Sequence, residues 1–143
     1  MKIKSKKILA IPKGRIKKEI ILLIESLGMK PESDFYKDTS RKLLFTTNIK
    51  NFFLTKVRNF DVPTIVAFGG ADFGIVGSDV VNEFDYEEIY SPIDLKLGKC
   101  SMVLAKNKNQ KIDPDASIIK VASKYPIATQ NFFESKGKQV ECI

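Results

Sequence analysis

Short apolar runs alternate along this chain with stretches in which apolar residues return every three or four positions. The run at residues 7–11 is typical of a strand, and it ends at residues 12–15, a turn with proline, glycine and two basic residues. Beyond the turn, apolar residues recur at helical spacing over residues 16–27, and Gly28 follows where a helix end needs a left-handed backbone. The pattern therefore predicts a strand, a turn and a helix in succession.

The rest of the chain repeats this alternation. Loops or connectors are predicted at residues 30–40, 92–99 and 106–116. Strands are predicted at residues 43–46, 52–57, 73–76 (short and buried), 86–90, 101–105, 117–122 and 139–143. Helices are predicted to begin at Asp61, at residues 77–79, and after Ser123 to span 124–136, with Asp61 and Ser123 as caps and glycines 69, 70 and 137 as terminators. Such alternation predicts an α/β architecture.

The pattern changes over the connector at residues 92–99, which suggests two lobes. We expect a first α/β lobe over residues 1–95 and the start of a second over residues 96–143. The last predicted strand is apolar, and a terminal apolar strand normally leads into further structure, so we expect the second lobe to be cut short. Ligands of α/β folds bind beyond the carboxyl ends of the strands, often between two lobes.

Composition narrows the class of protein. With 143 residues, of which 43% are hydrophobic, the chain can bury a real core. Its apolar stretches are far shorter than the roughly 20 residues of a membrane helix, and too few apolar residues follow the basic N-terminus for a signal peptide, so we expect a cytoplasmic protein. Only Cys100 and Cys142 are present and histidine is absent, which predicts buried free thiols and no zinc site.

The formal net charge of +7 is compatible with nucleic acid, anionic lipid or small polyphosphate ligands, since positive charge attracts each of them. The lysines are spread along the chain, without a nucleic-acid recognition signature or a long basic run. We therefore expect neither nucleic acid nor membrane as a partner, and we attribute much of the charge to solubilising lysines.

The turn at residues 12–15 is the first candidate site. It follows a strand and opens a helix, where backbone amides and the helix dipole favour an anion. Gly14 lets the backbone approach a ligand, while Lys13 and Arg15 add charge, and arginine offers a fork that matches phosphate oxygens. An ordinary basic turn is the alternative interpretation.

Arg41 and Lys42 form a second basic cluster, between the polar loop and a strand. Taken alone, the cluster is typical of a solvated loop end. The cluster becomes a candidate binding site if it faces Arg15, because a site for two polyphosphates must neutralise many negative charges.

Two further segments place polar residues beside glycines or helix starts. Asp72 and Ser78 lie at the two ends of a predicted strand at residues 73–76, and Asp72 could accept hydrogen bonds from a ribose or instead close a local turn. Lys124 and Tyr125 open the last predicted helix, a second possible anion site. The common phosphate-loop and hydrolase motifs are absent from the sequence, which argues against those mechanisms.

Taken together and in order, these segments resemble the ATP phosphoribosyltransferase family along nearly the whole chain. The resemblance rests on residues 11–15, 40–43, 61–64, 70–79, 94–100 and 121–126. It implies a two-lobed fold like the type II periplasmic binding proteins, with the active site in the cleft. In this family N1 of ATP displaces pyrophosphate from the anomeric carbon of phosphoribosyl pyrophosphate, with Mg²⁺ on the phosphates.

The resemblance also assigns roles to residues. Arg15 and Arg41 are expected to be catalytic, holding the ATP phosphates and the leaving pyrophosphate, with one of them supplied across a dimer interface. The expected substrate-binding residues are Lys13, Gly14, Lys42, Asp72, Ser78, Lys124 and Tyr125. No protein-held metal is expected.

The motifs are more similar to the short form of the family, which implies a homodimer within a hetero-oligomer that contains a regulatory subunit resembling histidyl-tRNA synthetase. Family members continue beyond the strand at residues 139–143 into a loop that cradles the phosphoribosyl phosphate. This chain has no such segment, so we expect a truncated catalytic subunit with impaired binding of phosphoribosyl pyrophosphate.

Two other functions remain open at this stage. A non-enzymatic small-anion-binding module of the same two-lobed class would share the strand ends and helix starts. A basic nucleic-acid-binding domain would share the charge, and steep loss of binding with added salt would identify it.

Overall fold

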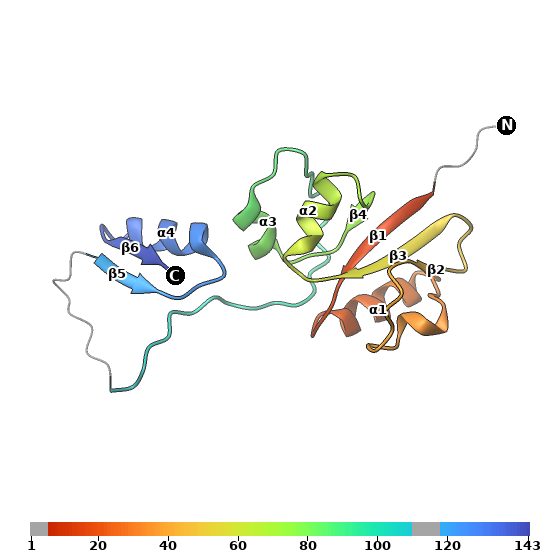
Figure 1. Cartoon of the computed structure of the whole chain (residues 1–143), viewed down its shortest axis with the longest axis horizontal. Helices are drawn as coiled ribbons and strands as arrows, with labels where there is room; N and C mark the ends of the chain where they lie inside the picture. Colours follow the sequence, from red (N-terminus) through yellow and green to blue (C-terminus); the bar gives the residue numbers. More distant parts are fainter. Residues whose placement is uncertain (1–5, 110–117) are drawn as a thin grey trace. The chain divides into compact units, whose positions relative to one another are not determined.

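The computed structural model describes residues 6–109 and 118–143, and its contacts divide the chain into two units, residues 1–99 and 100–143. Each unit combines strands with helices (Figure 1). The α/β class predicted from the sequence is therefore confirmed. No helix within the described residues is both long and apolar enough to cross a membrane.

The boundary between the units falls after Lys99, whereas the sequence placed it after residue 95. The residues between these positions contact the first unit: Leu97 packs against its core, and the N–H of Gly98 donates to a carboxylate oxygen of Glu19 at 3.1 Å. The connector thus closes the first unit before the second begins.

A four-stranded sheet in the order β2-β3-β1-β4 forms the centre of the first unit. Its strands are β1 (Lys7–Pro12), β2 (Phe45–Thr46), β3 (Phe52–Val57) and β4 (Phe73–Gly74). β1 pairs in parallel with both β3 and β4, and β2 and β3 form the predicted antiparallel hairpin. Because β1 and β3 are parallel, their carboxyl ends meet at one edge of the sheet.

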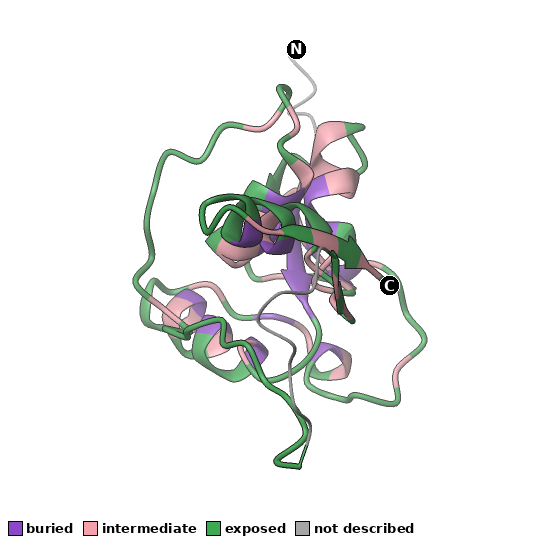
Figure 2. Cartoon of the chain, turned by 90° about the vertical axis from the view of Figure 1, so that its left-hand side faces the viewer, coloured by how far each residue is buried: buried purple, intermediate pink, exposed green. Residues whose placement is uncertain are grey.

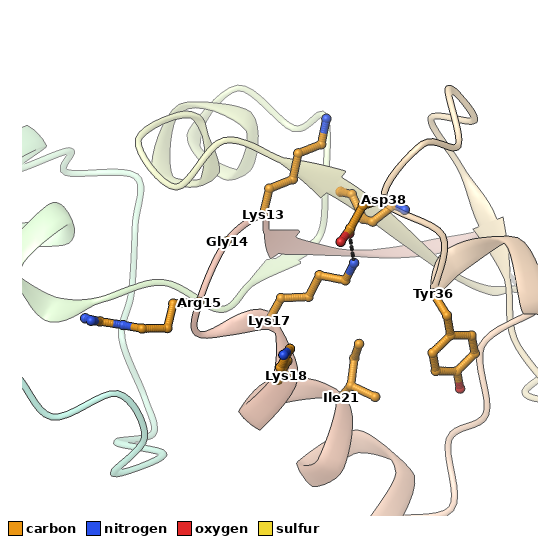
Figure 3. Close-up of a pocket in the computed structure, with 9 residues that line it drawn as sticks. Lys13, Gly14, Arg15, Lys17, Lys18, Ile21, Tyr36 and Asp38 are labelled. Carbon is orange, nitrogen blue, oxygen red and sulfur yellow. Dashed lines mark hydrogen bonds and ion pairs between the residues drawn. The ribbon is translucent and has the colours of Figure 1, made fainter.

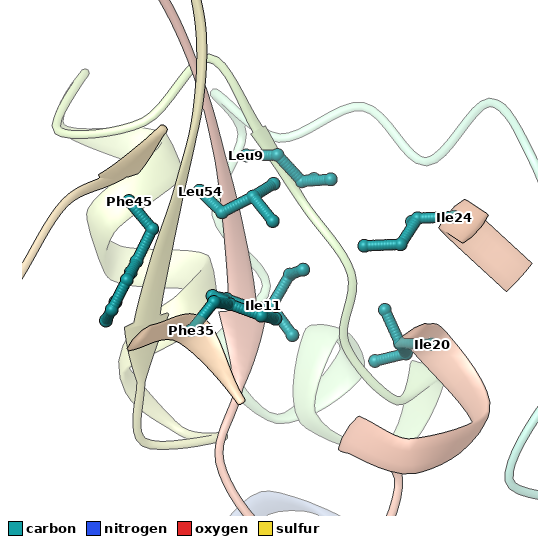
Figure 4. Packing of buried hydrophobic residues seen from close by; sticks show 7 residues of the cluster. All are labelled: Leu9, Ile11, Ile20, Ile24, Phe35, Phe45 and Leu54. Carbon is teal, nitrogen blue, oxygen red and sulfur yellow. The ribbon is translucent and has the colours of Figure 1, made fainter. Parts of the chain in front are cut away.

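Helices cover both faces of the sheet, and alternate side chains of β1 point toward opposite faces. On one face Leu9 and Ile11 join a cluster with Ile20 and Ile24 of α1 (Lys17–Ser26) (Figure 4). On the other face Ala10 packs with Val62 of α2 (Asp61–Ala67). The remaining helices of this unit are η1 (Ser33–Phe35), a single 3₁₀ turn, and α3 (Ser78–Phe84).

Phe35 is fully buried although it lies in the stretch predicted to be a polar loop. Its ring meets the ring of Phe45 edge to face, with centroids 5.2 Å apart. The loop is mostly irregular, as predicted, but η1 folds Phe35 into the core of the sheet. A single aromatic residue among polar neighbours gives no periodic signal, which is why the sequence pattern missed it.

Glycines end three helices as predicted, and in α2 the N–H of Gly69, at φ +74°, donates to the carbonyl of Val66 at 3.0 Å. Gly28 has φ +85°, its N–H donates to the carbonyl of Glu25, and the N–H of Met29 donates to the carbonyl of Ile24, each at 2.9 Å. Gly137, at φ +67°, closes the last helix in the same way. These paired bonds satisfy carbonyl oxygens that a helix end would otherwise leave open.

The predicted helix caps are wrong in detail. Phe60 occupies the N-cap position of α2, so Asp61 is the first helical residue rather than the cap. Its negative charge in the first turn interacts favourably with the helix dipole. Ser123 lies two residues before the N-cap of the last helix, Tyr125, and its hydroxyl accepts the N–H of Tyr125 at 3.0 Å. It orders the turn that leads into the helix.

The second unit is a strand, helix, strand arrangement. β5 (Ile118–Val121) and β6 (Gln139–Cys142) pair in parallel, and α4 (Pro126–Glu134) connects them and packs on β6. These elements match the predicted ones within a few residues. Residue 117 and most of the predicted loop at residues 106–116 lie outside the described residues.

Three strand predictions and the thiol prediction need correction. Residues 86–90 and 101–105 form no strand: Tyr86 stacks on Phe84, and residues 102–104 are more than half exposed, with no neighbouring strand to pair with in the described part of the chain. β4 is present but exposed rather than buried. Cys100 is exposed and Cys142 half-buried, although both are free. Figure 2 shows burial concentrated on the strands and helices and exposure along the extended stretches.

The burial of Phe35 generates a stability prediction. Phe35→Ala removes a fully buried ring from the core and should lower the free energy of unfolding by about 3–5 kcal/mol. Phe68→Ala is the matched control, because Phe68 is 78% exposed, and should cost less than about 1 kcal/mol. Urea unfolding followed by circular dichroism measures both, and equal losses would contradict the assigned packing.

Candidate functional site

An open cleft of about 470 Å³ lies at the edge of the sheet where β1 ends. Figure 3 shows the residues that line it. Five of them carry cationic side chains and one carries a carboxylate: Lys13, Arg15, Lys17, Lys18, Lys56 and Asp38. Gly14, Ile21 and Tyr36 complete the lining. The balance of charge suits an anion with several negative charges.

The turn at residues 12–15 is held in place by backbone hydrogen bonds. The N–H of Lys13 continues the pairing of β1 and β3 by donating to the carbonyl of Val57 at 2.8 Å. Gly14 then turns the chain with φ +106°, and its carbonyl accepts the N–H of Lys17 at 3.2 Å. A Cβ on Gly14 would meet no atom within 4 Å, so the positive φ is what calls for glycine here.

The first turn of α1 carries two cations, Lys17 and Lys18, and one anion, Glu19. The N-terminus of a helix has partial positive charge and unpaired amides, so cations there raise the free energy of the helix and an anion lowers it. α1 has ten residues. This arrangement favours a ligand such as phosphate, which would offset the repulsion between the helix end and its own lysines.

The opposite wall of the cleft is the loop after η1. The ammonium of Lys17, almost fully buried, forms an ion pair with Asp38, and this bond holds the pKa of the Asp38 carboxyl below its usual value. Lys56 donates to the carbonyl oxygens of Phe35 and Lys37, at 3.0 and 2.8 Å. Burial, followed by the charge of Lys17, lowers the pKa of Lys56.

Tyr36 contributes a phenol to the same wall. Its hydroxyl donates to a carboxylate oxygen of Glu25 at 2.5 Å, and this bond raises the pKa of Tyr36 to about 12. Tyr36 therefore stays protonated at neutral pH. The cleft thus offers hydrogen-bond donors and fixed charges rather than a general base, which fits binding and charge neutralisation more than proton abstraction.

The structure brings three of the predicted site residues into this cleft: Lys13, Gly14 and Arg15. The Arg15 side chain extends away from the ion pair of Lys17 and Asp38 (Figure 3). Arg15 and the pair therefore border different parts of the lining.

Arg41 and Lys42 are close in sequence to Asp38, which lines the cleft. Within the described parts of the chain, neither Arg41 nor Lys42 is itself a lining residue. Lys42 is engaged elsewhere, in an ion pair with Glu32, which also accepts the N–H of Thr46 at 3.1 Å. The bond from Lys42, followed by that from the Thr46 hydroxyl, lowers the pKa of Glu32 to about 2. Arg41 is exposed between Asp38 and Lys42, two residues that are each tied to the first unit.

Asp72 lies beside the amino end of β1, at the end of the strands opposite the cleft. Its carboxylate accepts the ammonium of Lys7 at 2.7 Å and the N–H of Ile8 at 2.8 Å, and the first bond lowers the pKa of the Asp72 carboxyl. Ile8 is five residues before Lys13 on an extended strand, a distance of roughly 16 Å. The structure therefore does not bring Asp72 to the cleft, and its observed contacts fix the start of β1.

The other predicted binding residues sit at helix starts. Ser78 is the first residue of α3, which follows β4, and Gly77 precedes it as N-cap. Lys124 is exposed and Tyr125 occupies the N-cap of α4, both in the second unit. None of the three lines the cleft described above, within the described residues.

Sequence reasoning missed several lining residues: Lys17, Lys18, Tyr36, Asp38 and Lys56. One signal was available for Lys56, since it occupies an inward position of a strand whose alternate residues are apolar. A cation at such a position needs a buried partner or a function. For Asp38, only the folding of the loop reveals its partner.

Comparisons with known proteins give one consistent family. A family model described as ATP phosphoribosyltransferase matches residues 58–143. A protein named ATP phosphoribosyltransferase from Rhizorhabdus wittichii is 47% identical over 139 residues, covering 95% of this chain and 63% of that protein. One with the same name from Sphingopyxis alaskensis is 49% identical over 138 residues, covering 95% and 61%. This chain thus spans a little over three fifths of these relatives' length.

A solved structure agrees with the sequence relatives. It is titled as the ATP phosphoribosyl transferase (HisG:HisZ) complex from Thermotoga maritima. One of its chains superimposes with a TM-score of 0.63 at 28% sequence identity, covering 96% of this chain and 63% of that one.

The turn at Gly14 generates a binding prediction. Gly14→Ala forces a side chain into a backbone conformation that costs about 1–3 kcal/mol, and relaxation of the turn should weaken pyrophosphate binding about tenfold. Gly137→Ala is the matched control, because Gly137 also has a positive φ but ends a helix in the other unit. Titration calorimetry measures both affinities, and equal weakening would contradict a local role of the turn.

Glu32 generates a pH prediction. Its pKa in the folded chain, about 2, lies below the usual 4.5, so its contribution to stability is complete above pH 4.5 and is lost as the pH falls toward 2. Glu32→Gln should therefore lose less stability between these pH values than the unaltered chain. Urea unfolding at a series of pH values measures this, with Glu87→Gln, an exposed turn residue, as control. Parallel curves for all three proteins would refute the assignment.

Proposed function

The chain belongs to the ATP phosphoribosyltransferase family, and from this premise we propose that it supplies the greater part of a catalytic subunit of that enzyme. The reaction transfers the 5-phosphoribosyl group of phosphoribosyl pyrophosphate to N1 of ATP and releases pyrophosphate, which opens histidine biosynthesis. The observation that carries the proposal is the cleft at the end of β1, with five cations, one carboxylate and a helix N-terminus.

The chemistry explains why such a cleft is suitable. The lone pair of N1 forms a bond to the anomeric carbon as the bond from that carbon to pyrophosphate breaks, and pyrophosphate leaves with the electron pair. Negative charge grows on the leaving group, so fixed cations and correct positioning lower the barrier, and no strong base or covalent intermediate is needed. Lysine and arginine side chains at the end of a strand and the start of a helix supply those cations.

The proposed roles follow the positions of the side chains. Lys13, Gly14 and Arg15 bind phosphate groups at the turn, with the amides at the start of α1. Arg15 and Arg41 act as the catalytic arginines, and one of them reaches a site shared with a second copy of the chain. Ser78, Lys124 and Tyr125 contact substrate from the starts of α3 and α4.

Two of the residues predicted from the resemblance take other roles in this proposal. Lys42 fixes the segment after Arg41 through Glu32 and contributes to substrate binding only through its charge. Asp72 is left out of the site, because its carboxylate binds Lys7 and Ile8 at the amino end of β1, away from the cleft.

Magnesium is proposed as a companion of the substrate phosphates rather than a metal held by the chain. The cleft contains one carboxylate, Asp38, and Lys17 is paired with it. Within the described residues, no group of three or more acidic or cysteine side chains could hold a metal ion. These residues fit a polyphosphate that arrives with its own magnesium, which would supply additional charge neutralisation.

We also propose the assembly. The two units correspond to the two lobes of a type II periplasmic-binding-protein-like fold, and the subunit forms a homodimer within a hetero-oligomer with a histidyl-tRNA-synthetase-like regulatory subunit. The structure from Thermotoga maritima, titled a HisG:HisZ complex, supports this partner. The location that we propose is the cytoplasm, where the ATP that the reaction consumes is available.

An activity assay tests the proposed function. The chain is mixed with ATP, magnesium and phosphoribosyl pyrophosphate, and the ultraviolet absorbance of phosphoribosyl-ATP is followed. The assay is repeated with a fusion that adds the part of the Rhizorhabdus wittichii relative lying beyond the matched residues. We expect product from the fusion, and binding of pyrophosphate without product would instead identify an anion-binding module.

Arg41→Ala in that fusion should lower kcat by about a hundredfold or more, since an oriented donor to developing negative charge contributes at least that much. Lys50→Ala is the charge control, because Lys50 is exposed in the turn before β3, at the amino end of that strand. It should retain full activity. Unchanged turnover in Arg41→Ala would remove Arg41 from the proposed mechanism.

A further inference from the structure

The loop that carries Arg41 is tied to the sheet and to α1 by two lysines from different elements. Lys56, near the end of β3, binds the carbonyl oxygens of Phe35 and Lys37. Lys17, at the start of α1, binds the carboxylate of Asp38. Side-chain bonds thereby join the loop after η1 to the end of β3 and to the start of α1.

Packing alone does not explain a lysine at position 56. Its side chain points to the same face as Leu54, and the residue is only 7% exposed. Its ammonium lies 4.6 Å from the ring centroid of Phe45 and 5.5 Å from that of Phe35. A buried ammonium is costly unless hydrogen bonds or rings compensate it, and methionine would fill the same space without a charge. The charge is therefore explained by the two carbonyl oxygens that it binds.

The ion pair of Lys17 and Asp38 joins a nearly buried side chain to an exposed one. The Lys17 side chain is 9% exposed and that of Asp38 is 88% exposed, so the loop reaches from solvent over a nearly buried ammonium. Asp38 has no packing role at this exposure. Its contact can be removed without opening the core.

Arg41 follows three residues after Asp38, which limits it to about 10 Å from that anchor even when the chain is extended. On its other side, Lys42 is held by Glu32. Arg41 is thus confined between two anchored residues, although its own side chain is exposed. Loss of either anchor would widen the range of positions that the guanidinium occupies.

We propose that Lys56 and Asp38 are positioning residues, which hold the loop at residues 35–41 against the start of α1 so that Arg41 is presented to the bound polyphosphate. The inference rests on the proposed function for the identity of the ligand, but the anchoring itself does not depend on it. A binding site formed by one anchored loop and one helix start is preorganised, so less entropy is lost when the anion binds.

Hydrogen exchange measured by mass spectrometry tests the anchoring on the 143-residue chain without ligand. In Lys56→Met and in Asp38→Asn, amides of residues 36–42 should exchange about tenfold faster, because local opening becomes easier while β1 and α1 keep their protection. Lys37→Met is the matched control. Lys37 lies in the same loop, and its side chain is exposed and bound only to Asp34 three residues away in the described contacts. Its exchange should change less than about twofold.

The Asp38 variant keeps the test decisive if Lys56→Met fails to fold, since the Asp38 side chain contributes nothing to the core. Exchange of residues 36–42 in Asp38→Asn equal to that of the unaltered chain overturns the anchoring, whatever the Lys56 variant does. A similar increase in Lys37→Met also overturns it, because the loop would then respond to any loss of charge.

A double-mutant cycle separates positioning from direct contact with the ligand. Asp38→Asn should weaken pyrophosphate binding about tenfold in the unaltered chain but less than about twofold when Arg41→Ala is already present, because both changes remove the same contact. Asp38 is used here because Lys56→Met would also remove one of the cations that line the cleft. Additive losses would show that Asp38 acts on the anion by a route that does not involve Arg41 and would overturn the positioning role. If the fusion forms no phosphoribosyl-ATP, the proposed function fails, and the exchange measurements still decide the anchoring.

Discussion

Parallel pairing of β1 with β3 is the constraint on which the rest of the first unit depends. The pairing sets Ile11 opposite Lys56 and Pro12 opposite Val57, so both strands end at one edge of the sheet. The apolar side chains of β1 are buried beneath α1, and this burial fixes where the helix begins. The turn at Gly14 and the ammonium of Lys56 therefore meet in one cleft, as a consequence of core packing.

Crowding of cations at that edge is the main electrostatic cost of the site. Lys17 and Lys18 stand in the first turn of a helix whose dipole disfavours positive charge, and Lys56 is buried beside them. The structure offsets part of this cost with Asp38 and with the backbone carbonyls that Lys56 binds. The remaining positive charge is available to a polyanion, so the features that destabilise the empty cleft are the ones that favour its ligand.

Local patterns predicted the elements well where burial and periodicity agree. Strand β1, helix α1 and the glycine that ends it follow from residues 7–28, because apolar spacing and a left-handed terminator are local properties. Residues 86–90 and 101–105 also carry strand-forming side chains, yet they form none. A strand needs a partner with free backbone groups, and composition does not show whether a partner exists. Phe35 was missed for the opposite reason, since its burial depends on distant residues.

The sequence by itself determined the α/β class, the basic turn that opens α1, and a resemblance that the family comparisons confirmed. These features depend on residues close together in the chain or on their order along it. Only the tertiary structure decided which charges share a cleft. Strand register placed Lys56 opposite Ile11, so that it lines the same cleft as Lys13. A loop brought Asp38 to Lys17, and parallel pairing placed Asp72 beside the amino end of β1. Such contacts link residues far apart in sequence, and their geometry is fixed by the packing of the whole sheet, which no local pattern encodes.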